Sequence, residues 1–153
     1  AIVRKSIPDA TFLLGGPVDP HNDAINVKEI KEIWKEKYGI DYLGYIEDPR
    51  EAIKNCSVYV LLSYNEGTPR TVLESMSMGR PIITTDVNGC RETVIHMKNG
   101  YLVPQFDHIE TAKYMLSFND KNLIEKMGNQ SRIYCSQKYD VHKVNSSILK
   151  IIN

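Results

Sequence analysis

The sequence lacks the features that mark several classes of protein. Its three cysteines, Cys56, Cys90 and Cys135, are widely spaced and form no C-x-x-C pair, so we expect reduced thiols rather than a disulfide framework or a zinc site. No second histidine lies at ligand spacing from His96, which predicts that no metal is bound. No apolar run approaches the roughly 20 residues of a membrane span, and no signal peptide is visible, so we expect a soluble, cytoplasmic protein.

Charge of one sign is not in excess either. The chain of 153 residues carries 19 basic and 19 acidic side chains, so no strong overall field attracts nucleic acid or an anionic membrane. This balance does not exclude local charged patches. The G-x-G-x-x-G fingerprint of dinucleotide-binding proteins is missing after Gly15-Gly16. We therefore interpret this pair as a turn with positive φ rather than as a ligand contact. The length fits a single domain over residues 1–153.

What the sequence does contain is an alternation of short apolar runs with amphipathic stretches. This alternation predicts an α/β fold in which helices flank a parallel sheet. Asn26 with Glu29 resembles a capping box, and Asp48 before Pro49 fits the start of another helix. The expected strands are residues 11–14, 40–46, 58–62, 81–85 and 101–103, and the expected helices are residues 26–37, 50–56, 70–78, 109–118, 121–139 and 141–152.

The most informative stretch is residues 58–85, VYVLLSYNEGTPRTVLESMSMGRPIITT, which predicts a strand, an acidic loop, a short helix and a second strand. Thr68 fits the N-cap of the helix, and Pro69 fits its first position. Gly79 fits the left-handed residue just past the end of the helix, and Pro81 prevents its continuation.

The start of this helix is the candidate binding site. A helix N-terminus at the carboxyl end of parallel strands has free N–H groups and the positive end of a dipole, so it favours a phosphate near Gly67 and Thr68. Glu66 precedes the helix, and Glu74 lies inside it. Carboxylates are poor partners for phosphate but accept hydrogen bonds from hydroxyls. A ligand that has both a diphosphate and vicinal hydroxyls, such as a nucleoside diphosphate sugar, fits this arrangement.

Residues 66–74, EGTPRTVLE, resemble the E-x7-E motif of retaining glycosyltransferases of family 4, which have the GT-B fold. The segments SMSMGRPII (75–83), DVNGCRE (86–92) and NGYLVP (99–104) resemble the continuation of that family in the same order. The resemblance implies a Rossmann-like parallel sheet flanked by helices, which is the C-terminal, donor-binding half of such an enzyme. It also implies that the chain lacks its first strand and the N-terminal acceptor domain, and that alone it binds weakly and catalyses poorly.

The resemblance also assigns roles to residues. It implies retaining transfer of a sugar from a nucleotide donor, a UDP-sugar, without a cofactor. Glu66 is the candidate catalytic residue and would hold hydroxyls of the transferred sugar, whereas Glu74 would hold the ribose hydroxyls. Tyr45 and Ile46 are candidates for the nucleobase pocket, and packing of Tyr45 at the end of a strand is the alternative. The donor-binding residues that the resemblance implies are Gly67, Thr68, Pro69, Arg70, Thr71, Glu74, Tyr45 and Ile46.

Other segments are predicted to support the site or a partner. Asn88-Gly89 fits a turn whose glycine brings a loop close to the donor sugar, and we expect Glu92 to be a cap or loop anchor. His96 is expected on the surface. The last helix, residues 141–152, is apolar enough to predict an exposed patch or a dimer contact.

The acceptor and the function class stay open. The Thr-Pro-Arg version of the loop resembles bacterial enzymes that build glycans on polyprenyl diphosphate carriers, so a glycan or lipid-linked acceptor and a contact with the inner face of the membrane are expected through the absent domain. A nucleotide-sugar 2-epimerase and a non-catalytic signalling module of receiver type are the alternatives. Asp48 and Asp86 do not match the acidic positions that a receiver requires, and fold alone does not settle function.

Overall fold

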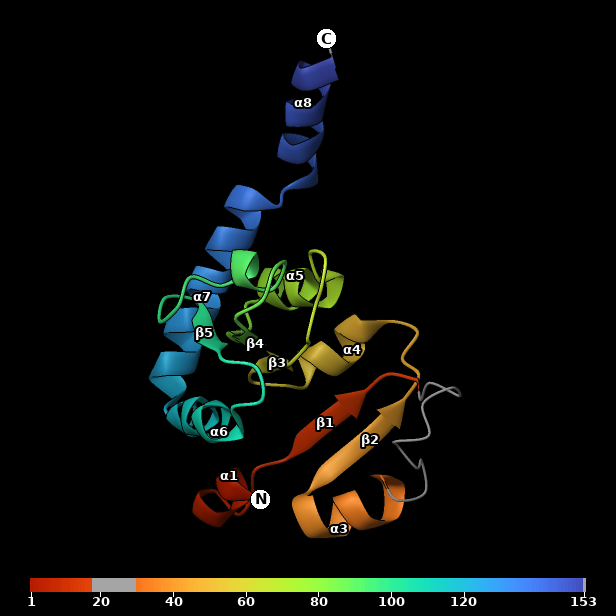
Figure 1. Cartoon of the computed structure of the whole chain (residues 1–153), viewed down its shortest axis with the longest axis vertical. Coiled ribbons are helices and arrows are strands. Elements are labelled where there is room, and N and C mark those ends of the chain that lie inside the picture. The colour runs from red at the N-terminus through yellow and green to blue at the C-terminus, as the bar shows by residue number, and fades with distance from the viewer. Residues whose placement is uncertain (18–29, 153) are drawn as a thin grey trace. The chain divides into compact units, whose positions relative to one another are not determined.

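The computed structural model describes residues 1–17 and 30–152, and the chain divides into two compact units, Ala1–Cys56 and Ser57–Asn153. Each unit contains parallel strands and helices (Figure 1), so the predicted α/β fold is confirmed. The capping box that we expect at Asn26 and Glu29 lies outside the described residues. The expectation of a single domain over the whole chain stays a prediction.

The described residues of the first unit contain one parallel pair of strands. Phe12 of β1 lies opposite Ile40 of β2, and the amide of Gly16 donates to the carbonyl of Gly44 over 2.8 Å. Gly16 has the positive φ, 139°, that we expected, but Gly15 is the last residue of β1, so the pair as a whole does not form the predicted turn. The elements are α1 (Ile2–Ser6), β1 (Phe12–Gly15), the π-helical turn η1 (Ile30–Trp34), α3 (Lys35–Tyr38), β2 (Ile40–Gly44) and α4 (Pro49–Lys54).

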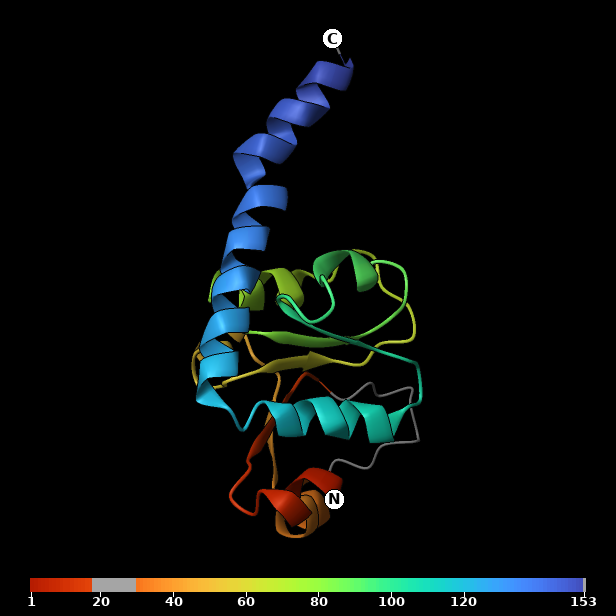
Figure 2. The same cartoon turned by 90° about the vertical axis from the view of Figure 1, so that its left-hand side faces the viewer.

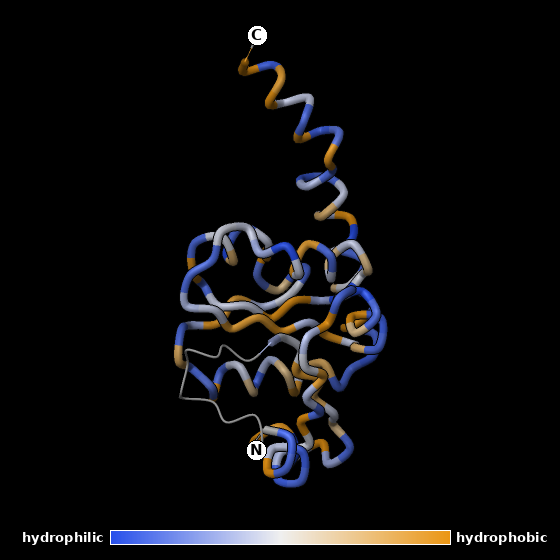
Figure 3. The backbone as a smooth tube through the Cα atoms, turned by 90° about the vertical axis from the view of Figure 1, so that its right-hand side faces the viewer, coloured by the Kyte–Doolittle hydropathy of each residue, from blue (hydrophilic) through white to orange (hydrophobic). Residues whose placement is uncertain are grey.

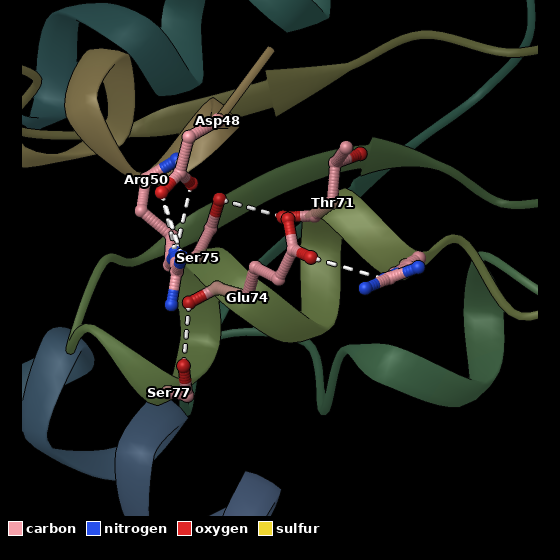
Figure 4. A network of polar contacts seen from close by, with 7 residues as sticks. Asp48, Arg50, Thr71, Glu74, Ser75 and Ser77 are labelled. Atoms are coloured by element: carbon pink, nitrogen blue, oxygen red, sulfur yellow. Dashed lines mark hydrogen bonds and ion pairs between the residues drawn. The ribbon is translucent and has the colours of Figure 1, made fainter.

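Two local predictions in this unit have different outcomes. Asp48 caps α4 as expected, because its Oδ1 accepts from the amide of Arg50 over 3.0 Å, and the Arg50 side chain also donates to it (Figure 4). Hydrogen bonds from Arg50 hold the pKa of Asp48 below its ordinary value. The strand expected to reach Ile46 instead ends at Gly44, where a φ of 69° turns the chain.

The second unit is built around a three-stranded parallel sheet in the order β3-β4-β5. Tyr59 of β3 lies opposite Ile82 of β4, and Ile83 lies opposite Tyr101 of β5, which is an edge strand of this sheet. The elements are β3 (Tyr59–Leu61), α5 (Arg70–Ser77), β4 (Ile82–Thr85), the 3₁₀ turn η2 (Arg91–Thr93), β5 (Gly100–Val103), α6 (His108–Ser117), α7 (Lys121–Lys138) and α8 (Val141–Ile152).

Helices cover both faces of this sheet (Figure 2). All four residues of β4 are buried, as expected for a strand packed on both faces. Successive side chains of a strand point to opposite faces, so Ile82 joins a cluster with Val72 and Met76 of α5, whereas Ile83 joins a cluster with residues of α6 and α7. The sheet is thus held between α5 on one face and α6 on the other, and α7 contributes residues to the clusters on both faces.

The C-terminal end of α5 follows the prediction. The amide of Arg80 donates to the carbonyl of Ser75, and the amide of Gly79 donates to the carbonyl of Met76, each over 2.9 Å. Gly79 has a φ of 72°, so this is a Schellman motif with glycine at its left-handed position. The same glycine packs against α7, since a Cβ on Gly128 would overlap the carbonyl oxygen of Gly79.

The N-terminal end of α5 corrects the prediction. Pro69, not Thr68, is the N-cap, and no side chain caps the helix. Pro69 has an extended backbone with a ψ of 112°, and its carbonyl accepts from the amides of Val72 and Leu73. The helix therefore begins at Arg70, and Pro69 precedes it instead of taking its first position.

The last helix, α8, buries none of its residues. Hydrophobic and hydrophilic positions alternate along it (Figure 3), and Val141, Ile148 and Ile151 are among its exposed apolar side chains. The exposed apolar patch that we predicted for this segment is confirmed. Among the described residues, no helix is both long and apolar enough to cross a membrane.

Candidate functional site

The loops that follow β3, β4 and β5 leave the sheet at the same edge (Figure 2), because the three strands are parallel. The loop after β3 contains the predicted carboxylate Glu66 and leads into α5, whereas the loop after β4 contains Asp86 and Gly89. Ligands of open α/β sheets bind at this carboxyl edge. The predicted residues of the central stretch therefore gather at the edge where a ligand site is expected.

The side chain of Glu66 has a fixed orientation. The hydroxyl of Ser63 donates to its Oε1 over 2.7 Å, and the residue is half-buried. Ser63 is itself held by β4, since the hydroxyl of Thr85 donates to its carbonyl over 2.5 Å. Neither Ser63 nor Thr85 was predicted, although a serine three residues before a loop carboxylate is a signal for such a bond.

Gly89 brings the loop after β4 directly onto the loop after β3. It has a φ of 78°, and a Cβ at this position would overlap the carbonyl oxygens of Glu66 and Gly67. The close approach that we predicted for Gly89 is therefore made to the backbone of the acidic loop. A Cβ on Gly67, in contrast, would meet no described atom within 4 Å, so Gly67 is open to a ligand.

The start of α5 supplies unpaired hydrogen-bond donors. Within residues 1–17 and 30–152, no acceptor contacts the backbone N–H groups of Gly67, Thr68, Arg70 and Thr71. Pro69, between them, has no N–H group, and it is buried. Unpaired amides at a helix N-terminus, together with the positive end of its dipole, form a site for an anion.

Arg70 and Glu74 form an ion pair on the first turn of α5. The Nε of Arg70 lies 3.1 Å from Oε1 of Glu74, and the side chains are 91% and 25% exposed, respectively (Figure 4). The other oxygen of Glu74, Oε2, is buried and has no hydrogen-bond partner among the described residues. Glu74 thus retains one unsatisfied acceptor, and a hydroxyl donor of a ligand would satisfy it.

Tyr45 and Ile46 lie in the first unit, just after β2. Tyr45 is 75% exposed, so its ring does not pack on neighbours as the alternative interpretation requires. Ile46 is half-buried and packs against Gly15, where a Cβ would overlap its side chain. The role of both residues at a nucleobase stays a prediction.

Glu92 anchors a loop through its carbonyl rather than through its side chain. The hydroxyls of Tyr134 and Tyr139 and the Nζ of Lys138 donate to this one oxygen over 3.2, 2.8 and 2.8 Å. Burial raises the pKa of Tyr139, so its hydroxyl stays protonated and available as a donor. The side chain of Glu92 caps nothing in the described chain, so only the expectation of an anchor is confirmed.

The remaining predicted features concern side chains outside the acidic loop. His96 is exposed as expected, and its Nδ1 accepts from the amide of Leu102 over 3.1 Å. Cys56, Cys90 and Cys135 are free thiols, as predicted. The described residues contain no group of three or more His, Cys, Asp or Glu side chains that could hold a metal ion.

Comparison with known proteins gives a family. The sequence pattern of the family described as "Glycosyl transferases group 1" matches residues 1–120. A galactosyltransferase of Escherichia coli that is named for UDP-Gal and for α-D-GlcNAc-diphosphoundecaprenol is 27% identical over 131 residues, which cover 86% of this chain and 33% of that protein. The chain spans less than half the length of the curated relatives it matches.

Solved structures show the same fold, and these neighbours are GT-B glycosyltransferases. The Anabaena protein HepE in complex with UDP superposes with a TM-score of 0.82 at 21% identity, over 99% of this chain and 44% of that one. The C-terminal domain of a group 1 glycosyl transferase, LpcC from Francisella tularensis, superposes with a TM-score of 0.76 at 26% identity, over 92% of this chain and 75% of that one.

Proposed function

Because the chain belongs to the group 1 glycosyl transferases, we propose that it is the C-terminal, donor-binding half of a retaining GT-B glycosyltransferase that uses a UDP-sugar. One observation carries the proposal: the unpaired amides of residues 67–71 lie between Glu66, oriented by Ser63, and Glu74, which has a buried oxygen without a partner. A diphosphate and the hydroxyls on either side of it match these donors and acceptors.

The amides act on the leaving group. Breaking the bond between the sugar and the diphosphate places negative charge on the nucleoside diphosphate, and preorganised dipoles stabilise such charge. The N–H groups of residues 67–71 are preorganised because Pro69 is buried and Gly89 packs against the loop. Arg70 adds positive charge to the same helix end, although its side chain is paired with Glu74.

The two glutamates act as binding residues. Glu66 would accept from hydroxyls of the transferred sugar and Glu74 from those of the ribose. A pair of carboxylates that performs glycosidase chemistry must flank one anomeric carbon. Glu66 lies in a loop and Glu74 lies inside a helix, with seven residues between them, which favours two separate contacts along a long ligand.

The relatives indicate the class of donor and acceptor. The E. coli relative is named for UDP-Gal and for a lipid-linked diphosphate, and HepE was solved with UDP. We propose a UDP-sugar donor, and a glycan or a polyprenyl-diphosphate-linked acceptor that a second domain binds. A lipid-linked acceptor would bring the enzyme to the inner face of the membrane. The likeness to the C-terminal domain of LpcC supports the assignment of the donor half.

Titration with UDP, ADP and GDP, followed by thermal denaturation, tests the proposal. We expect UDP alone to stabilise the chain, by about 2.7 kcal/mol at 100 times its Kd. This corresponds to a rise in Tm of roughly 5–10 °C for a chain of this size. Glu74→Gln should remove most of the rise, whereas Glu125→Gln on the exposed face of α7 is the matched control and should retain it.

An unchanged Tm with all three nucleotides would contradict the proposal and would leave a receiver-type module open. The comparisons do not favour an epimerase. A product assay on the full-length protein distinguishes the two enzymes, because a transferase releases UDP only when an acceptor is present.

A further inference from the structure

Two large aromatic side chains form an exposed stack at the carboxyl edge of the sheet. Tyr64 follows β3 and Phe106 follows β5, and their ring centroids lie 5.1 Å apart with an angle of 30° between the planes. The two residues are 69% and 79% exposed. The stack therefore adds little to the core, and its outer surface is accessible to a ligand.

The position of the stack is fixed by its neighbours. The side-chain amide of Gln105 donates to the carbonyl of Tyr64 over 2.8 Å and so ties the two loops together. Asp107 caps α6, since its Oδ1 accepts from the amide of Glu110 over 2.8 Å. Phe106, between them, has a φ of 62°, a left-handed conformation that is unfavourable for a bulky residue. An exposed ring held at such a backbone position calls for a role other than packing.

A polar pocket adjoins the stack and shares Gln105 with it. Asp86 and Glu110 provide carboxylates at this pocket, and the hydroxyl of Tyr114 donates to Oε1 of Glu110 over 3.1 Å. Among the described residues, neither lysine nor arginine is in its lining, but the Nε of Arg91 lies 2.6 Å from Oδ1 of Asp86 and pairs with that carboxylate. The lining consists of Asp86, His96, Leu102, Val103, Pro104, Gln105, Glu110 and Tyr114. The carboxylate oxygens of Asp86 and Glu110 can accept further hydrogen bonds from neutral hydroxyls.

An aromatic surface beside such acceptors matches a saccharide. A pyranose ring can lay its apolar C–H face on an aromatic ring and direct its hydroxyls to carboxylate and amide groups. Tyr64 lies two residues before Glu66, where the transferred sugar is expected, so a saccharide on the stack would lie near the reacting centre.

We propose that Tyr64, Phe106 and the adjoining pocket bind the acceptor saccharide, so that the donor-binding half also contributes to the choice of acceptor. The inference rests on the proposed function, because only a glycosyltransferase needs a second sugar at this edge. It adds a site that is distinct from the amides of residues 67–71.

Saturation-transfer NMR and calorimetry on the chain test this site with two probes, the methyl glycoside of N-acetylglucosamine and, separately, UDP. We expect the glycoside to bind the unmodified chain and to bind Phe106→Gly and Tyr64→Ala at least about fivefold more weakly. The affinity for UDP should stay within about twofold of the original value in both variants. Phe106→Gly also relieves the left-handed φ, so it should fold at least as stably as the unmodified chain.

Met97→Gly is the matched control. Met97 is also exposed, at 68%, and has a φ of 65°, but it does not belong to the stack. Met97→Gly should change neither the affinity for the glycoside nor the affinity for UDP.

If the glycoside fails to bind the unmodified chain, or binds all variants equally while UDP still binds, the acceptor site is refuted and the donor site stands. If Phe106→Gly lowers the affinity for UDP tenfold, the stack binds the nucleotide and the inference is wrong. Loss of UDP binding by the unmodified chain would instead contradict the proposed function.

Discussion

At the scale of single residues, two glycines of the candidate site must be glycine for different reasons. Gly89 has a left-handed φ, and a Cβ there would overlap the backbone of Glu66 and Gly67. Gly67 has no such neighbour in the described chain, so only a ligand would crowd a side chain at this position. The first glycine therefore supports the shape of the loop, and we propose that the second keeps the binding surface clear.

This difference predicts opposite effects of two alanine substitutions. Gly89→Ala should lower the free energy of unfolding by about 2 kcal/mol or more, because of the overlap and the left-handed backbone. Gly67→Ala should change it by less than about 0.5 kcal/mol but weaken the binding of UDP at least about tenfold, since its Cβ would occupy the space that we propose for the diphosphate. Urea unfolding and calorimetry measure the two quantities. Equal losses of stability in both variants would refute this division of roles.

Individual residues were predictable where a local rule decides them. Asp48 caps α4 as predicted because an N-cap favours aspartate and the next residue is a proline. Gly79 ends α5 as predicted because the left-handed position after a helix favours glycine. Thr68 was assigned wrongly because Pro69 can serve as N-cap through its carbonyl and an extended ψ. The left-handed φ of Met97 and Phe106 could not be predicted, since both residue types disfavour it.

At the scale of elements, α5 is held against α7 by close contact between backbones. A Cβ on Gly128 of α7 would overlap the carbonyl of Gly79, which follows α5. The α5 helix carries Glu74 and the unpaired amides, so its position relative to the sheet determines the geometry of the candidate site. The sequence predicted both helices, but it gave no sign that a mid-helix glycine marks their contact.

We predict that Gly128→Ala destabilises the chain although alanine is the better helix former. The gain in helix propensity is about 1 kcal/mol, whereas overlap with the backbone of Gly79 should cost more than this, which leaves a net loss of about 1–3 kcal/mol. Asn129→Ala, at the next and exposed position, is the control and should be neutral or slightly stabilising. A stabilising Gly128→Ala in urea unfolding would show that the two helices do not pack as described.

The sequence predicted the strands but did not determine how they pair. The expected strands agree with the observed ones within about two residues because apolar runs and breakers define them. The order β3-β4-β5 depends on contacts between distant segments. Gly100 illustrates this, because the expected strand started at residue 101, whereas β5 begins at Gly100, where a Cβ would overlap the carbonyl of Ile82.

At the scale of the whole molecule, the loops and helix of the candidate diphosphate site all belong to the unit Ser57–Asn153. The same unit ends in α8, which exposes an apolar face and buries none of its residues. An exposed apolar helix face is a contact surface. The dimer contact that we expect there stays a prediction.

Removal of residues 141–153 tests what α8 contributes. We expect the Tm to change by less than about 2 °C, because no residue of α8 is buried in the chain. Sedimentation velocity should detect self-association of the intact chain and a monomer after truncation. A large fall in Tm would show that α8 packs on the rest of the chain, and a monomeric intact chain would refute the dimer contact.

The most direct test of the account is a crystal structure of the chain with bound UDP. We predict that the diphosphate accepts hydrogen bonds from the backbone amides of residues 67–71 and that Oε2 of Glu74 accepts from a ribose hydroxyl. A nucleotide bound elsewhere, or a Glu74 carboxylate that makes no contact with it, would contradict the account.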